Sequence, residues 1–260
     1  MAKHWLQAIM LLLYGIMPAL ASAADTEPQN ATPAPDPKTL RFVVYYPDFP
    51  PYIFTDSAGH ISGIVPDLLA PFFTQQQISV DYLLDNRAGA EQRLYRGEVD
   101  AMMLSPDWAT RPEQVIFSDS IIAYDDYFFA RSVLEVAETP EQLTGKKVCT
   151  REFYVYPALE PLFSSGQLLR VDASSQEAQL RMVLSKRCDL AYLNDLVANW
   201  LLINGFSGDK LYPSPLLIGK SGLTIALNPK WQTLLSALNY YLQQQQDNGE
   251  VQRVIARYLP

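Results

Sequence analysis

Residues 97–120 read GEVDAMMLSPDWATRPEQVIFSDS, and this stretch decides the fold. Gly97 ends a helix-like run, and Val99 to Leu104 is a short apolar run bounded by turn signals, as in a buried strand. An irregular loop follows, with Arg111 just beyond it. In open α/β sheets, ligands bind at the carboxyl ends of the strands, where a guanidinium suits a carboxylate or phosphate. The stretch predicts an α/β fold with Arg111 near a ligand; alternatively, Arg111 is a surface residue at a helix start.

The same stretch resembles the signature of bacterial extracellular solute-binding proteins of family 3, the polar amino-acid-binding type. That signature runs G-x-x-D, an apolar strand, a Ser/Thr-rich loop, an Arg and then F-S, and here Ser105, Arg111 and Phe117-Ser118 follow that order. The resemblance implies that Ser105 and Arg111 contact the ligand. The resemblance extends from Arg41 to the C-terminus. It implies the type II periplasmic binding protein fold, with two lobes. Each lobe is a doubly wound α/β sheet flanked by helices, and the ligand cleft lies between them.

The N-terminal region predicts export. Lys3, the apolar run from Leu6 to Leu20 and the A-x-A motif at Ala21–Ala23 indicate a cleaved signal peptide, and therefore a periplasmic protein. The following segment is rich in proline and lacks hydrophobic periodicity, so we expect a disordered leader. The expected organisation is a signal peptide (1–23), a leader (24–39), the first part of lobe one (40–129), lobe two (130–220) and the returning part of lobe one (221–260).

Composition argues against several classes of function. The chain carries 20 Lys and Arg against 28 Asp and Glu, a net charge of −8, whereas a nucleic-acid-binding protein would show a basic patch. Beyond the signal peptide the only histidine is His60, in a predicted turn. The sequence contains no phosphate-binding glycine loop, dinucleotide fingerprint or His/Cys metal cluster, so we expect no cofactor, no metal and no catalytic histidine.

The resemblance assigns ligand contacts to aromatic residues of lobe one. Phe49, in the loop after the first strand, holds the position of a ring that stacks on the ligand, and Tyr46 and Tyr52 flank it. Trp108 is a second candidate for stacking. The alternatives are that these rings close a local core and that Trp108 packs under its own loop.

Lobe two offers a second arginine. Residues 143–150, LTGKKVCT, resemble the family's entry strand into lobe two, and the loop after it carries Arg151 and Tyr154. In the family this loop is often glycine-rich and presents backbone N–H groups to the ligand carboxylate. Here Glu152 and Phe153 replace glycine, so Arg151 is a candidate replacement for those amides. The alternative is a surface Arg151 paired with Glu152.

Asn194 and Asp195 follow the third predicted strand of lobe two, where the family places an aspartate that binds the ligand ammonium. Counting along the strand gives Asn194 this position, which favours ligands without an ammonium. If Asp195 faces the cleft instead, α-amino acids are favoured. The alternative for both residues is capping of the next helix, since Asn and Asp are common caps.

The two cysteines are predicted to form a disulfide. Cys149 lies in the first strand of lobe two and Cys188 begins the third, and these strands are neighbours in a doubly wound sheet. An oxidising compartment permits the bond. The alternative is two buried free thiols.

The leading functional hypothesis is a periplasmic protein that captures a small carboxylate-bearing solute, an amino acid or related organic acid. It would act as a monomer and deliver the solute to the membrane subunits of an ABC importer or to a sensor. One alternative is an enzyme on the same fold, similar to cyclohexadienyl dehydratase, with Asp107, Asp195 or Glu152 as its acid. Another is an interaction protein with a vestigial cleft.

Overall fold

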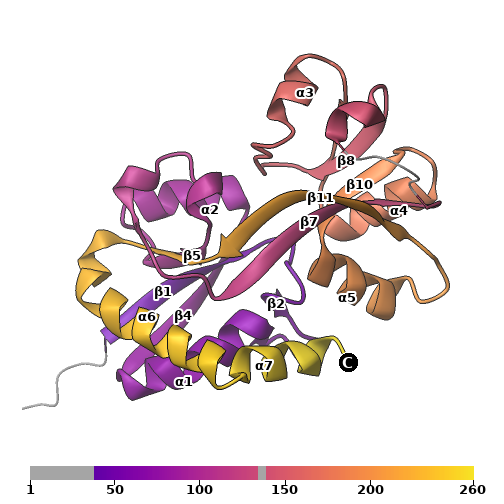
Figure 1. Ribbon diagram of the computed structural model, residues 1–260. Helices are drawn as coiled ribbons and strands as arrows, with labels where there is room; N and C mark the ends of the chain where they lie inside the picture. Colours follow the sequence, from indigo (N-terminus) through magenta and orange to yellow (C-terminus); the bar gives the residue numbers. More distant parts are fainter. Residues whose placement is uncertain (1–37, 134–138) are drawn as a thin grey trace, which may run out of the picture. The chain divides into compact units, whose positions relative to one another are not determined.

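The computed structural model describes residues 38–133 and 139–260, which form two five-stranded β-sheets flanked by helices (Figure 1). The expected signal peptide lies outside these residues, as does the leader up to residue 37. Lys38 and Thr39, expected to close the leader, instead begin the first strand. No helix within the described ranges is long and apolar enough to cross a membrane.

The first sheet has the strand order β4-β1-β5-β12-β6. Its strands are β1 (Lys38–Tyr45), β4 (Ile78–Asp85), β5 (Ala101–Met103), β6 (Ile116–Phe117) and β12 (Ile225–Leu227). β1 is parallel to both β4 and β5, while β12 is antiparallel to β5 and β6. β5 and β12 are buried throughout, as expected for strands covered on both faces.

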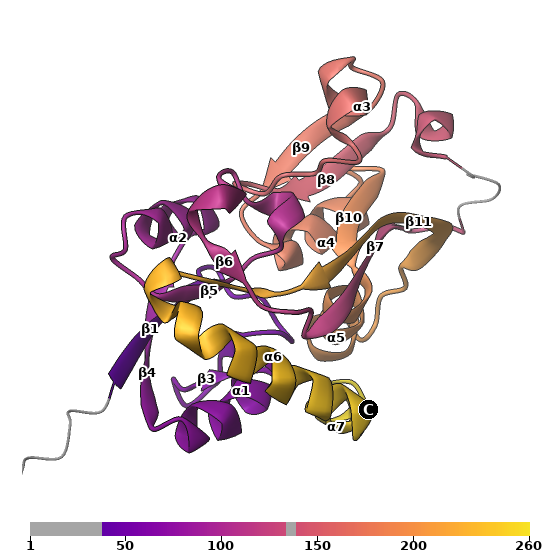
Figure 2. The same cartoon turned by 60° about the vertical axis from the view of Figure 1, so that its left-hand side comes forward.

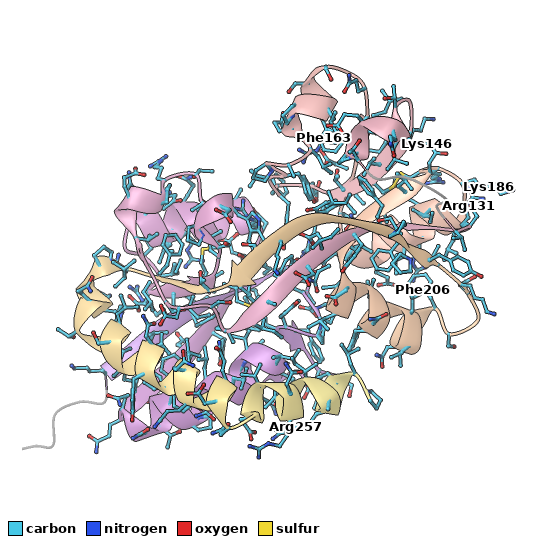
Figure 3. The ribbon with its side chains drawn as sticks, in the orientation of Figure 1. Arg131, Lys146, Phe163, Lys186, Phe206 and Arg257 are labelled. Atoms are coloured by element: carbon cyan, nitrogen blue, oxygen red, sulfur yellow. A yellow bond between two sulfur atoms is a disulfide. The ribbon has the colours of Figure 1, made fainter. Side chains whose placement is uncertain are left out.

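Helices cover the first sheet on both faces. α1 (Ile64–Gln75), α6 (Gln232–Asp247) and α7 (Glu250–Tyr258) contact one another, and α2 (Arg87–Tyr95) packs on β1 and β5 (Figure 2). Arg257 of α7, which is labelled in Figure 3, forms an ion pair with the Asp67 carboxylate of α1 at 3.5 Å. Asn86 caps α2 by accepting a hydrogen bond from the Gly89 N–H, which places Arg87 at the first helical position. A short hairpin, β2 (Phe54–Thr55) and β3 (Ile61–Ser62), precedes α1.

The second sheet has the order β11-β7-β10-β8-β9. Its strands are β7 (Ile122–Ala130), β8 (Lys147–Arg151), β9 (Leu169–Ala173), β10 (Leu190–Asn194) and β11 (Tyr212–Leu223). Its helices are α3 (Glu160–Ser164), α4 (Gln176–Leu184) and α5 (Asp195–Gly205). Ser175 caps α4, because its hydroxyl accepts a hydrogen bond from the Ala178 N–H.

Two long antiparallel strands, β7 and β11, link the sheets (Figure 1). Both belong to the second sheet, because β7 also pairs with β10. The second sheet therefore includes residues 122–129 and 221–223, which were expected in lobe one. The physical reason is that β7 already pairs with β11 at Ile122, so the strands that link the sheets begin within the range expected for lobe one.

The predicted disulfide between Cys149 and Cys188 is confirmed, with the two Cα atoms 5.7 Å apart. β8 and β10 are parallel neighbours, with Cys149 opposite Ala191, and Cys188 lies just before β10. The bond therefore ties β8, which ends at Arg151, to the start of β10.

Candidate functional site

A cavity of about 50 Å³ lies where the two sheets meet. Residues of both sheets and their loops line the cavity. The first sheet, its helix α2 and its loops contribute Tyr45, Phe49, Arg87, Met103 and Trp108. The second sheet contributes Tyr124 and Asp126 from β7 and, from its other strands, helices and loops, Arg151, Tyr154, Tyr156, Gln176, Gln179, Tyr192 and Asn194. This volume accommodates a few water molecules, whereas small-molecule sites typically measure about 300–1,000 Å³. The site is therefore nearly filled by its own side chains.

Aromatic rings form one wall of the cavity. Phe49 is buried and stacks on Tyr52 with ring centroids 5.2 Å apart, and Tyr52 stacks on Tyr124 at 5.6 Å. Trp108 meets Tyr124 edge-on at 4.8 Å. A backbone bridge between Phe49 and Ile53 holds the loop after β1 against the core. Such a wall can enclose the apolar body of a ligand.

Arg87 enters the cavity wall from the start of α2. It is 5% exposed and pairs with Glu91 at 3.4 Å. Its Nη1 donates to the Phe153 carbonyl at 3.0 Å, and its Nη2 donates to the Trp108 carbonyl. Arg87 is thus charge-compensated, and it joins α2 to the loop after β8.

Arg151 lies at the end of β8 and is 4% exposed. Its Nη1 donates to the Gln176 Oε1 at 2.9 Å and to the Asp48 carbonyl at 3.3 Å, and its Nη2 donates to the Pro47 carbonyl. No carboxylate among the described residues forms an ion pair with Arg151. Arg151 is therefore a buried guanidinium held by neutral acceptors, an arrangement suited to receiving an anion.

Tyr154 lies between the two arginines. Its ring is 5.6 Å from the Arg87 Cζ and 5.1 Å from the Arg151 Cζ. Its hydroxyl is buried without a hydrogen-bond partner among the described residues, and burial raises its pKa, so the hydroxyl remains neutral. Tyr154 therefore places its ring beside both guanidiniums and carries a hydroxyl without a hydrogen-bond partner among the described residues.

A buried carboxyl lines another part of the wall. Asp126 of β7 is 6% exposed, and its Oδ2 accepts the Tyr192 hydroxyl at 3.0 Å. Burial raises the pKa of Asp126 to about 8; the hydrogen bond from Tyr192 lowers it, while the charges of Asp195 and Asp125 add to the increase. The carboxyl of Asp126 is therefore largely protonated at neutral pH in this closed site.

The structure places Arg111 outside the cavity, contrary to the expectation that it contacts the ligand. Its guanidinium is exposed and lies 5.3 Å from the ring centroid of Tyr95, and its backbone N–H donates to the Tyr95 hydroxyl at 2.9 Å. The preceding residue, Thr110, donates its backbone N–H and its hydroxyl to Glu91. These contacts with α2 hold the loop so that Arg111 points away from the cavity.

Three other expected site residues also lie outside the cavity. Tyr46 is 62% exposed, and Ser105 bonds to the Ser221 hydroxyl at 2.8 Å. Asp195 accepts the Leu196 N–H at 2.7 Å at the start of α5, and burial raises its pKa. Five expected residues line the cavity: Phe49, Trp108, Arg151, Tyr154 and Asn194.

Asn194 lines the cavity, but its polar atoms are engaged elsewhere. Its Oδ1 accepts the Tyr52 hydroxyl at 2.8 Å and the N–H groups of Leu196 and Val197, and its Nδ2 donates to the Asp125 carbonyl at 3.1 Å. Asn194 is the N-cap of α5. Both Asn194 and Asp195 therefore accept backbone N–H groups at the start of α5, as the capping alternative stated.

Sequence reasoning missed two charged wall residues, and both carried a signal. Arg87 comes two residues after the end of β4, near a strand's carboxyl end, which is the criterion that singled out Arg111. Asp126 lies on the same buried face of β7 as Tyr124 and Phe128, two residues from each. A charge in phase with buried aromatic residues along a strand indicates a carboxyl directed inward.

Comparison with known proteins extends these observations. The sequence profile of the bacterial extracellular solute-binding proteins, family 3, matches residues 42–260, and no curated protein matches the chain. A histidine kinase sensor domain with similarity to periplasmic binding proteins is 21% identical and superposes with a TM-score of 0.72, over 86% of this chain and 97% of that one.

Two further solved structures share the fold. The substrate-binding protein of an amino acid ABC transporter is 17% identical, with a TM-score of 0.69, over 85% of this chain and 98% of that one. An ancestral amino-acid-binding protein, a precursor of cyclohexadienyl dehydratase, is 18% identical with a TM-score of 0.69, over 85% and 96%. These likenesses confirm the predicted two-lobed type II fold. Because the family profile covers most of the sequence, the chain belongs to the bacterial extracellular solute-binding proteins, family 3.

Proposed function

We propose that this solute-binding protein captures a small carboxylate-bearing solute, either an amino acid or a related organic acid. The observation that carries the proposal is the buried Arg151 guanidinium, which lines an aromatic-walled cavity and is bound only by neutral acceptors. A carboxylate is a stronger acceptor for a guanidinium than a backbone carbonyl, because the hydrogen bonds are charge-assisted and can be bidentate. Phe49, Tyr124 and Trp108 would enclose the body of the solute.

Binding requires the two sheets to separate. The cavity is too small for an amino acid, and Arg151 and Arg87 each donate hydrogen bonds across it to backbone carbonyls of the opposite side. We infer that the structure is a closed state and that β7 and β11 act as the hinge. Two-lobed binding proteins open and close in this way around their ligands. The solute carboxylate would take the place of the Pro47 and Asp48 carbonyls at Arg151.

Export and delivery belong to the same proposal. The family is extracellular, which supports reading residues 1–23 as a signal peptide and placing the protein in the periplasm. Solved relatives of similar fold include a sensor domain and a transporter's binding protein, so the partner is either an ABC importer or a sensor. N-terminal sequencing of the protein recovered from the periplasm tests the export step, and we expect its first residue to be Ala24.

A thermal-shift screen tests the function. The purified protein is heated with each standard L-amino acid and with a panel of small organic acids. We expect at least one carboxylate to raise the midpoint of unfolding, because a ligand bound only by the folded state stabilises it. Uncharged sugars provide the control set. If no carboxylate raised the midpoint, the proposal would be wrong.

A dehydratase-like lyase is the alternative function. One observation favours it: a solved structure of the same fold is described as a precursor of cyclohexadienyl dehydratase. The acids first considered, Asp107, Asp195 and Glu152, do not line the cavity, whereas Asp126 does. Incubation with prephenate distinguishes the two functions, because turnover supports the lyase and stabilisation without turnover supports capture.

A further inference from the structure

Two arginines line the cavity, and their side-chain partners differ in charge. Arg87 and Arg151 are the cationic residues of the wall within the described ranges. Arg87 is buried and lies 3.4 Å from the Glu91 carboxylate, one helical turn further along α2. Arg151 is also buried, but its Nη1 donates to an amide oxygen, the Gln176 Oε1, at 2.9 Å. Among the described residues, one guanidinium is therefore neutralised by a carboxylate and the other is not.

The start of α4 places Gln176 beside Arg151. Gln176 is the first residue of that helix, directly after the cap Ser175, and it is 5% exposed. A guanidinium carries hydrogen-bond donors only, so the amide must turn its oxygen toward Arg151. A glutamate has nearly the same shape and would accept the same bond, but it would add a negative charge. A neutral amide therefore occupies a position that a carboxylate would also fit.

The other ionisable groups of the wall add no positive charge. They are one carboxyl and five phenols: Asp126, Tyr45, Tyr124, Tyr154, Tyr156 and Tyr192. Burial raises the pKa of each, which keeps the phenols and most of the Asp126 carboxyl uncharged at neutral pH. Within the described part of the chain, the wall thus presents a single positive charge that no residue neutralises.

We propose that Gln176 sets the charge selectivity of the site: it holds Arg151 with a neutral amide, while Glu91 neutralises Arg87, so the site takes a solute with one anionic group. The inference rests on the proposed function, in which Arg151 binds a carboxylate. A second carboxylate on the solute would lose its hydration in the closed site and meet no uncompensated cation, which is costly. The solute class is therefore a monocarboxylate, and solutes with two carboxylates are disfavoured.

Pairs of probes that differ by one carboxylate test the solute class. L-Glutamine and L-glutamate have nearly the same shape, as do L-asparagine and L-aspartate, and succinamate and succinate. Calorimetry measures each of them on the wild-type protein, together with the carboxylate that gives the largest thermal shift. We expect the probe with one carboxylate to bind about 30-fold or more tightly than its partner with two, as for an unpaired charge in a desolvated site.

Gln176→Glu tests the residue itself. The new carboxylate keeps the hydrogen bond to Arg151 and neutralises it, so the variant should fold, while its affinity for each monocarboxylate probe should fall by about 30-fold or more. A purely structural Gln176 would tolerate this change, because shape and hydrogen bond are kept. Gln244→Glu adds the same charge at an exposed position of α6 outside the cavity, and this matched control should change affinity by less than about threefold.

Glu91→Gln provides the converse test. It removes the carboxylate that neutralises Arg87, so the wall then holds two uncompensated guanidiniums. The discrimination of this variant against succinate, relative to succinamate, should be at least about tenfold weaker than that of the wild type. A discrimination equal to that of the wild type would show that the partners of the two arginines do not set the charge selectivity.

The two proposals fail in different ways. If Gln176→Glu bound carboxylates as tightly as the wild type, the role of Gln176 would be refuted while the capture of carboxylates stood. If no carboxylate bound the wild type, both proposals would fall. Should Gln176→Glu not fold, the wild type still decides: the inference would be overturned if the two-carboxylate member of a pair bound as tightly as its partner, or if a dicarboxylate gave the largest thermal shift.

Discussion

Arg111 lies beyond a buried strand of the first sheet and Arg151 ends a buried strand of the second, yet only Arg151 lines the cavity. Arg151 is the last residue of β8, so the strand itself directs its side chain, and 4% of the residue remains exposed. Arg111 comes eight residues after the end of β5, in a loop held against α2 by Glu91 and Tyr95. The comparison shows that the sheet sets the direction of an arginine side chain within a strand. For an arginine in the loop after a strand, the residues that contact the loop set that direction instead.

The largest expected effect concerns the anchoring of β8. The Cys149–Cys188 disulfide ties the strand that carries Arg151 to β10, across a sequence separation of 39 residues. Replacing both cysteines with alanine should lower the free energy of unfolding by about 4 kcal/mol in the chain-entropy description. Denaturant titration measures it, and reductant should leave the double variant unchanged. A loss below about 1 kcal/mol would show that β8 is held by packing alone.

The second effect concerns the anchoring of the Arg111 loop. Glu91 is 1% exposed, pairs with Arg87 and accepts the N–H and hydroxyl of Thr110. Glu91→Gln should lower the free energy of unfolding by about 3 kcal/mol, because Arg87 is left as an uncompensated buried charge. Glu98→Gln, at an exposed ion pair, is the matched control and should change stability far less, because solvent screens that pair. Equal effects of the two variants would show that Glu91 does not anchor the loop through its charge.

Asp100 precedes β5 and should make stability depend on pH. Burial raises its pKa, but hydrogen bonds from Arg41 and Lys230 outweigh burial and lower the pKa to about 2. The ionised form therefore stabilises the fold above the unfolded pKa of about 4, and this contribution is lost as the pH falls towards 2. Asp100→Asn should cost about 1–2 kcal/mol at neutral pH, because its partners are partly exposed. Denaturant titration at several pH values should show that the difference in the free energy of unfolding between Asp100→Asn and the wild type becomes smaller in acid. A difference that does not change with pH would show that packing, and not the charge, causes the effect.

The smallest effect tests the loop after Arg151. Phe153 has a left-handed backbone, with φ of 66°, and its side chain is 53% exposed. This conformation costs a non-glycine residue about 1–2 kcal/mol, while glycine loses about 0.5–1 kcal/mol of chain entropy. Phe153→Gly should therefore stabilise the protein by about 0.5 kcal/mol. Val155→Gly, in the same loop, should lower the free energy of unfolding, and denaturant titration measures both variants. If both variants lowered this free energy, the Phe153 ring would contribute to packing.

Sequence patterns predicted the features that depend on hydrophobic periodicity and strand adjacency. The buried strands follow from such patterns, and the Cys149–Cys188 bond follows from the adjacency of two of these strands, whereas the two-lobed fold was implied by the family resemblance. The left-handed Phe153 also explains why glycine is usual at that position in the family.

The directions of individual polar side chains could not be predicted in the same way. Arg111 turns away because of contacts with Tyr95 and Glu91, which lie on a helix outside the motif. In the pair Asp125 and Asp126, the alternation along β7 puts Asp126 on the face of Tyr124 and Phe128, but the sequence reading did not place the start of this strand at Ile122. Asn194 looked like a ligand contact because both capping and ligand binding favour an asparagine at the end of a strand.

The most direct test of the central claim compares the two arginines by calorimetry, using the carboxylate that gives the largest thermal shift. Arg151→Ala should weaken binding by about 30-fold or more, corresponding to the loss of a charged hydrogen-bonded contact in a desolvated site. Arg111→Ala, the matched control, should change affinity by less than about threefold. Circular dichroism verifies that both variants are folded. If Arg111→Ala abolished binding while Arg151→Ala left it unchanged, the ligand site would lie beyond the end of β5, and Arg151 would not be the residue that binds the carboxylate.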